Sequence, residues 1–169
     1  MNRRTFVKAT GATAITATAF PADAATAHVS FDLAKDLIMA WREKSIEGVL
    51  ARLTDDIVWY SHVGTAPKIG KAQVKAFLDV FAGSISEVKW RIFGYAISGQ
   101  QIFLEGADDF VLLPEKRRVG IPYAGVLTFR GNLISEWRDY FDRNLFDKLK
   151  AGEPTPPEIQ KLLDRPALF

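Results

Sequence analysis

The sequence contains no cysteine and only two histidines, His28 and His62. The absence of cysteine excludes disulfide bonds and thiolate chemistry. Two histidines are too few for a multi-histidine metal site, and the chain has no glycine-rich phosphate-binding motif. We therefore expect a protein that works without a metal ion or an organic cofactor.

Long hydrophobic runs are also missing. The most apolar stretch near the start, residues 9–20, consists mainly of Ala and Thr and is too short and too weakly apolar to span a bilayer. It follows N-R-R-T-F-V-K at residues 2–8 and precedes an A-x-A site at residues 22–24. This pattern resembles a twin-arginine export signal. We expect cleavage after Ala24 and a periplasmic location for the folded protein.

The excess of positive charge, +2 for the whole chain, belongs to this signal. The signal holds Arg3, Arg4, Lys8 and one acid, Asp23, so residues 25–169 keep 19 of the 22 basic and 19 of the 20 acidic residues. The mature protein is therefore formally neutral. Net charge gives it no attraction to nucleic acid or, once the signal is removed, to a membrane surface.

Residues 25–152 have the size of one domain, and the Pro-rich piece from Glu153 to Pro157 separates them from a tail, residues 153–169. Apolar spacing predicts a helix from Ser30 to about Lys44, a short helix after Ser45, and one over 71–82 that ends at Gly83. Alternation predicts strands at 56–62, 90–98, 101–113, 117–129 and 133–142, and a closing helix at 143–150. Helices followed by hairpins predict an α+β fold, with helices on one face of a curved antiparallel sheet around a hollow for a small ligand.

Polar side chains on apolar strand faces indicate where the chemistry lies. Alternation predicts a pocket lined by five of them: Tyr60, His62, Arg91, Asp108 and Asp139. Asp108 and Asp139 are each the only charge on their strand face. Either could be a strand-end residue or half of a salt bridge. If the two lie together, their pKa values move apart, and identical side chains become an acid and a base.

Three segments resemble the limonene-1,2-epoxide hydrolases, which belong to the nuclear-transport-factor-2-like (SnoaL-like) superfamily. They are Y-S-H-V-G from Tyr60 with Gly70 and Lys71, L-E-G-A-D ending at Asp108, and W-R-D-Y-F-D starting at Trp137. The resemblance covers about Phe31 to Leu149. It implies a cone-shaped fold, in which a curved mixed or antiparallel sheet wraps on the N-terminal helices around an apolar pocket. It also implies a homodimer, because dimers are common in this fold.

The resemblance assigns roles residue by residue. In these hydrolases, an Asp at the position of Asp139 activates water, and an Asp at the position of Asp108 protonates the epoxide oxygen. A Tyr at the position of Tyr60 and an Asn at the position of His62 hold the water. The arginine that bridges the two carboxylates is replaced here by Gly106. If Gly99-Gln100 is a two-residue turn, Arg91 lies opposite Asp108 and can replace the missing cation, although a one-residue slip would undo this pairing.

The sequence thus predicts a cofactor-free hydrolase that adds water to a small lipophilic epoxide by Asp/Asp acid–base catalysis. Two alternatives remain open, because this fold hosts unrelated activities. One is an isomerase or cyclase that uses His62 as its base, since a histidine there is similar to the ketosteroid isomerases, which have an Asp base at nearly the same place. The other is a non-catalytic binding protein for a hydrophobic small molecule.

Overall fold

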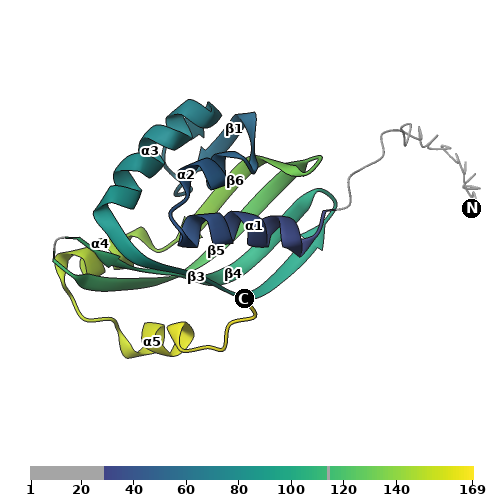
Figure 1. Ribbon diagram of the computed structural model, residues 1–169. Coiled ribbons are helices and arrows are strands. Elements are labelled where there is room, and N and C mark those ends of the chain that lie inside the picture. Colours follow the sequence, from purple (N-terminus) through teal and green to yellow (C-terminus); the bar gives the residue numbers. More distant parts are fainter. Residues whose placement is uncertain (1–28, 114) are drawn as a thin grey trace, which may run out of the picture.

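The computed structural model describes residues 29–113 and 115–169, so the predicted export signal lies outside the described residues. Five helices and six strands follow one another along this part of the chain (Figure 1). The order is α1 (Phe31–Arg42), α2 (Ile46–Leu50), β1 (Leu53–Tyr60), β2 (Lys68–Ile69), α3 (Gly70–Ser84), β3 (Ile85–Ser98), β4 (Gln101–Leu112), β5 (Arg117–Arg130), β6 (Leu133–Phe141), α4 (Arg143–Ala151) and α5 (Pro157–Leu163).

The helices form where the apolar spacing predicts them. Helix α1 buries a stripe that includes Leu37, Ile38 and Trp41. Ser45 begins α2, because its hydroxyl accepts the Gly48 N–H at 3.2 Å. Helix α3 does not end at Gly83 as predicted; it continues through Ser84 and passes directly into β3.

All six strands form one mixed sheet in the order β2-β1-β6-β5-β4-β3. Neighbouring strands are antiparallel except β1 and β6, which are parallel. The sheet curves strongly. Trp90 on β3 stacks on Trp137 on β6 with ring centroids 5.7 Å apart, although two strands lie between them. In a flat sheet these strands would be roughly 14 Å apart. The predicted α+β fold with a curved sheet is therefore confirmed.

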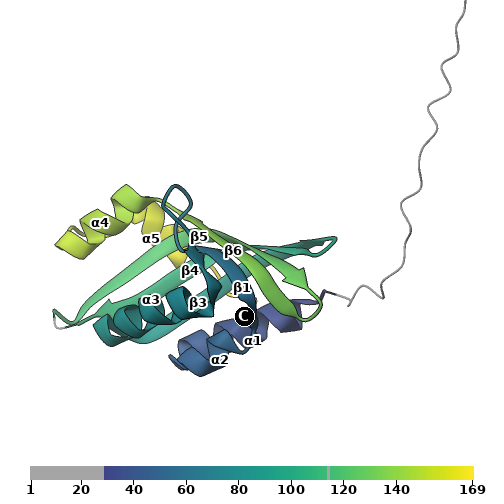
Figure 2. The same cartoon turned by 90° about the horizontal axis from the view of Figure 1, so that it is seen from above.

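Helices α1, α2 and α3 cover the concave face of the sheet, whereas α5 lies on the opposite side (Figure 2). Helix α5 was not predicted. Its Leu163 is buried and touches the place where a Cβ of Gly120 would stand. After α5, the backbone of Leu168 and Phe169 exchanges hydrogen bonds with Ile92 of β3. None of the described helices has the length and apolar character that crossing a membrane requires.

Candidate active site

A cavity of about 590 Å³ lies between the concave face of the sheet and helices α3 and α4. Its wall is rich in aromatic side chains, and it includes two acidic and three basic side chains. The aromatic residues are Trp41, Trp59, His62, Phe77, Phe81, Trp90, Phe110, Tyr123, Trp137, Phe141 and Phe146. The lining residues Thr65, Ala66, Arg143 and Lys150 are exposed, so the mouth lies between the loop that follows β1 and helix α4. Figure 2 shows this loop and α4 next to each other.

Asp108 projects from β4 into this cavity, where it lies opposite Trp90 of β3 and Ile121 of β5. Burial raises the pKa of its carboxyl group to about 7, and the negative charge of the adjacent Asp109 adds to the rise. Its Oδ1 atom is buried and has no hydrogen-bond partner among the described residues. A large fraction of Asp108 is therefore protonated near neutral pH.

Asp139 projects into the same cavity from β6. Two indole N–H groups donate to its carboxylate: that of Trp137 to Oδ1 at 2.7 Å, and that of Trp59 to Oδ2 at 3.1 Å. Burial raises the pKa of Asp139 to about 7, the two indole donors counteract the rise, and the charge of Asp108 adds to it. The two carboxyl groups therefore influence each other, and Asp139 is the one that its neighbours favour in the ionised form.

Tyr123 lies between the two acids and was not anticipated from the sequence. On β5 it is two residues from Ile121, which pairs with Asp108, and two residues from Gly125, which pairs with Asp139. Burial raises the pKa of the phenol well above its ordinary value, and the charges of Asp139 and Asp108 add to this effect. The nearby Trp90 side chain offsets the rise slightly, but no described atom meets hydrogen-bond geometry with the hydroxyl. The hydroxyl is therefore a protonated donor without a partner among the described residues.

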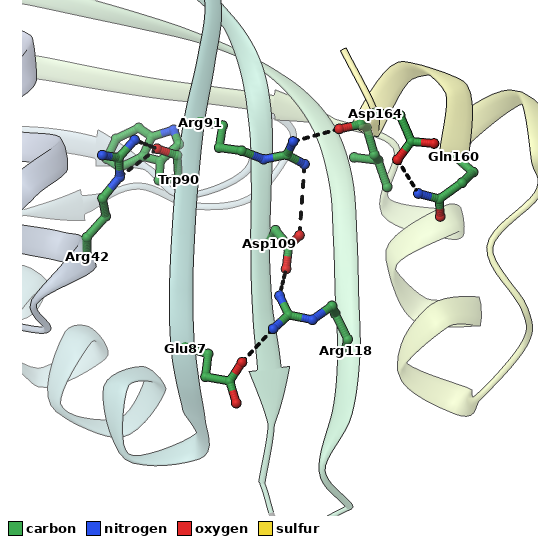
Figure 3. A network of polar contacts seen from close by, with 9 residues as sticks. Arg42, Glu87, Trp90, Arg91, Asp109, Arg118, Gln160 and Asp164 are labelled. Atoms are coloured by element: carbon green, nitrogen blue, oxygen red, sulfur yellow. Dashed lines mark hydrogen bonds and ion pairs between the residues drawn. The ribbon is translucent and has the colours of Figure 1, made fainter. Parts of the chain in front are cut away.

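The expected pairing of Arg91 with Asp108 is wrong. The hairpin begins as predicted, with Ser98 opposite Gln101, but a β-bulge at Phe93 shifts the register by one residue. Trp90 consequently takes the place opposite Asp108, and Arg91 turns to the outer face. There its guanidinium donates to the Leu163 carbonyl at 2.6 Å and lies 3.9 Å from Asp109 (Figure 3). Arg91 holds helix α5 against the sheet.

Asp109 is the centre of a charge network on this outer face. Arg118 bonds to Asp109 and also donates to Glu87 at 2.6 Å (Figure 3). Asp108 and Asp109 thus point to opposite faces of the same strand, and the second acid has cations beside it while the first has none. No ion pair to Asp108 or Asp139 occurs within residues 29–113 and 115–169.

Tyr60 does not line the cavity, contrary to expectation. Strand β1 buries Ile57 and Trp59 on its inner side, and Tyr60 therefore points the other way. Trp59 occupies the inward position, where it contacts Asp139. Alternation along 56–62 therefore predicted the wrong inward face of this strand.

His62 lies on the cavity wall, as predicted. Its Nε2 atom is 3.3 Å from the Phe141 carbonyl, so this nitrogen is the one that carries the proton. Nδ1 is buried and has no hydrogen-bond partner among the described residues. Neither ring nitrogen is a free, exposed base.

The site can perform acid–base chemistry on an apolar molecule. Two coupled carboxyl groups with pKa values of about 7 can give and take protons at neutral pH. In the part of the chain that the structure describes, no three His, Asp or Glu side chains are grouped so that they could hold a metal ion.

A curved mixed sheet is thus closed by helices over a cavity rich in aromatic side chains. Residues 34–137, more than half of the chain, match the SnoaL-like domain. The protein belongs to the SnoaL-like family.

Solved structures agree with this assignment. The structure of an LEH-like epoxide hydrolase from M. tuberculosis is 25% identical, with 70% of this chain and 86% of that chain covered and a TM-score of 0.62. A structure described as a SnoaL-like polyketide cyclase from Shewanella denitrificans is 19% identical. The match covers 72% of this chain and 96% of that chain, with a TM-score of 0.66. The epoxide hydrolase/cyclase-like enzyme SalBIII is 15% identical, with 67% of this chain and 90% of that chain covered and a TM-score of 0.62. No curated protein sequence matches this chain.

Proposed function

We propose that this protein is a cofactor-free hydrolase that adds water to a small apolar epoxide, in the manner of the limonene-1,2-epoxide hydrolases. The observation that carries the proposal is the placement of Asp108 and Asp139 on one aromatic cavity wall, each with a pKa of about 7. Such a pair supplies a base and an acid at the same pH. The likeness to an epoxide hydrolase structure at 25% identity supports the same reaction.

In this proposal Asp139 is the general base and Asp108 the general acid. Asp139 accepts two indole N–H bonds that favour its ionised form, whereas Asp108 keeps its proton because its Oδ1 has no donor among the described residues. Asp139 takes a proton from water while the water oxygen bonds to an epoxide carbon. The ring C–O bond breaks, the oxygen takes the proton of Asp108, and a diol forms. A proton then passes from Asp139 to Asp108 through solvent.

Tyr123 is proposed to take part in this reaction. Its hydroxyl stays protonated because its pKa is raised, and it lies between the two acids without a described partner. It can therefore donate a hydrogen bond to the epoxide oxygen as negative charge develops there. Tyr123→Phe keeps the ring and removes the hydroxyl, and it is expected to lower kcat by about 10²-fold to 10³-fold.

The test is diol formation from small apolar epoxides such as styrene oxide in H₂¹⁸O. One ¹⁸O atom is expected in each diol. Asp139→Asn and Asp108→Asn are each expected to lower kcat by about 10²–10⁴-fold. Glu105→Gln is the matched control, because this acid lies on the same strand as Asp108 but is exposed and bonds to Arg165. Loss of activity in all three variants alike would show that the acids act through the fold alone.

The same experiment separates the alternatives. An isomerase that uses His62 as base exchanges hydrogen with solvent and incorporates no ¹⁸O. The hydrogen bond from Nε2 to Phe141 and the burial of Nδ1 suit a positioning role for His62 better than proton abstraction. His62→Asn restores the residue of the related hydrolases, so a hydrolase tolerates it and such an isomerase loses its activity. Tight binding with no turnover of any compound would identify a binding protein.

A further inference from the structure

Three basic side chains line the cavity together with the two acids: Lys68, Arg143 and Lys150. Arg143 is neutralised by Asp147, whose carboxylate is 2.9 Å from its Nε. Lys68 and Lys150 form no ion pair with any acid among the described residues. Neither ammonium group therefore has an acid of the described residues within ion-pair distance, although Lys150, after Arg143, contributes to lowering the pKa of Asp147.

Lys68 is the more constrained of the two. It pairs with Trp59 in the β1–β2 register, so both side chains face the cavity. Its Nζ lies 4.3 Å from the ring centroid of Phe77 and 5.6 Å from that of Trp59, and it donates to the Ser61 hydroxyl at 2.8 Å. Burial lowers the pKa of this ammonium group. A half-buried cation with one neutral oxygen acceptor has donors left for an anion.

The position of Lys68 relative to the acids fixes the ligand geometry. The Trp59 ring lies beside Lys68, and the indole N–H of the same ring donates to Asp139. One indole ring therefore separates the ammonium group from the carboxylate. A molecule that reaches Asp139 with one end can reach Lys68 with the other.

Lys150 carries the second unpaired charge to the mouth of the cavity. It is exposed at the end of α4, with its ammonium group 5.8 Å from the Phe146 ring centroid. Arg143 is exposed on the same helix. Cations at the opening of a cavity attract an anionic ligand and raise its local concentration.

We propose that the cavity takes an organic acid with an apolar body, whose carboxylate is bound by Lys68 and whose reactive group faces Asp108 and Asp139. Lys150 attracts the acid at the mouth. The part of this inference that concerns the reactive group rests on the proposed function; the binding of the carboxylate does not. The aromatic wall binds the apolar body, and the cation selects acids over neutral compounds of the same shape.

Binding is measured through tryptophan fluorescence, because all four tryptophans of the chain line the cavity. The probes are 4-phenylbutyrate, 4-phenylbutanol and 4-phenylbutylamine, which share one apolar body and differ in charge. At pH 6.5 and low salt the acid is expected to bind about tenfold more tightly than the alcohol. Equal affinity for acid and alcohol, or tightest binding of the amine, overturns the proposal.

Lys68→Met keeps the aliphatic stem over the two rings and removes the charge. It is expected to weaken binding of the acid about tenfold and to leave the alcohol unchanged. Lys148→Met is the matched control on α4, because Lys148 does not line the cavity. Lys68→Arg retains the charge, so preference for the acid persists if the side chain binds the carboxylate. Equal loss for acid and alcohol in Lys68→Met, or loss of the preference in Lys68→Arg with an unchanged melting temperature, contradicts the proposal.

The outcomes also separate this inference from the proposed function. Preference for the acid that depends on Lys68, without turnover of any epoxide, supports the carboxylate site and refutes the hydrolase. Turnover of neutral epoxides together with equal affinity for the acid and the alcohol refutes the carboxylate site and leaves the hydrolase standing.

Discussion

The ring of Tyr123 lies directly over Gly106. A Cβ at Gly106 would stand 2.9 Å from Cε1 of the tyrosine, and a Cβ at Gly125 would stand 2.9 Å from Cε2 on the other side. These two glycines form a slot in which the phenol ring lies between the two acids. Gly106 is also the position where the related hydrolases have an arginine, so a tyrosine from the neighbouring strand occupies the space beside the acids here.

Gly106→Ala is expected to destabilise the protein strongly. The added Cβ would lie 2.1 Å from the backbone carbonyl oxygen of Arg91, which cannot move without disturbing β3. The expected loss is about 3 kcal/mol in the free energy of unfolding, measured by urea denaturation. Gly94→Ala is the control, because the nearest atom to its added Cβ is 3.9 Å away. Equal stability of the two variants would contradict the close packing of other groups against Gly106.

Asp108→Asn is expected to stabilise the protein above pH 7. The pKa of Asp108 is about 7 in the folded state, against 3.8 for an unperturbed Asp. The unfolded chain thus releases its proton first as pH rises, and folding stability falls between about pH 4 and pH 7 and is then constant. Asn removes this loss, which is on the order of 2–4 kcal/mol at pH 8.

Thermal unfolding at pH 5 and pH 8 checks this expectation. The wild-type melting temperature is expected to be lower at pH 8, and the difference is expected to shrink in Asp108→Asn. Part of the pH dependence remains in the variant, because the pKa of Asp139 is also raised. A variant that melts below the wild type at pH 8 would mean that Asp108 is stabilised by a cation, contrary to its observed surroundings.

Trp137→Phe is expected to raise the pKa of Asp139. The substitution removes the indole N–H that donates to Oδ1 at 2.7 Å and favours the ionised carboxylate. The acidic limb of the pH profile of kcat/KM is expected to move to higher pH by about one unit. Trp41→Phe serves for comparison, since Trp41 lines the cavity without a hydrogen bond to Asp139. The same shift of the acidic limb in both variants would mean that altered packing in the cavity, and not the lost hydrogen bond, raises the pKa of Asp139.

Export is expected to depend on the arginine pair at the start of the chain. Changing Arg3 and Arg4 together to Lys removes the feature that the twin-arginine pathway reads. The full-length precursor should then stay in the cytoplasm, as fractionation and immunoblotting detect. Mature protein in the periplasm of this variant would refute the signal, and cleavage after Ala24 is checked by N-terminal sequencing of the wild type.

Alternation and periodicity were sufficient to predict the curved α+β fold and the two acids. Asp108 and Asp139 could be predicted as pocket residues because each is the only charge on an apolar strand face. Burying such a charge is costly, so its presence there indicates a special role. His62 lines the cavity although the strand face used to select it was wrong, because β1 ends at Tyr60 and His62 follows it. The predicted homodimer and the export signal remain predictions.

Three local features escaped the sequence argument. The bulge at Phe93 adds one residue to β3, and alternation does not encode such an insertion, so Arg91 was assigned to the wrong face. In β1 the strand extends back to Leu53, and its inner face holds Trp59 instead of Tyr60. Tyr123 was overlooked, although Gly106 and Gly125 within strands are signals that another group comes close.

Helix α5 also had a signal in the sequence. Pro157 occupies its first turn, where a missing N–H costs nothing, and Glu158 follows in the same turn. Its amphipathic pattern is short, and its burial depends mainly on Leu163. The helix is placed by tertiary contacts, including the bond from Arg91, which only the folded sheet can supply.

The hydrogen bonds between Ile92 and the last two described residues have a consequence for association. Strand β3 is one edge of the sheet, and an uncovered edge offers its peptide groups to strands of other molecules. Leu168 and Phe169 occupy these groups at Ile92, next to the bulge that already bends the strand away. The opposite edge, β2, is only two residues long. Both edges of the sheet therefore offer fewer free peptide groups for the strand-to-strand growth that leads to aggregation.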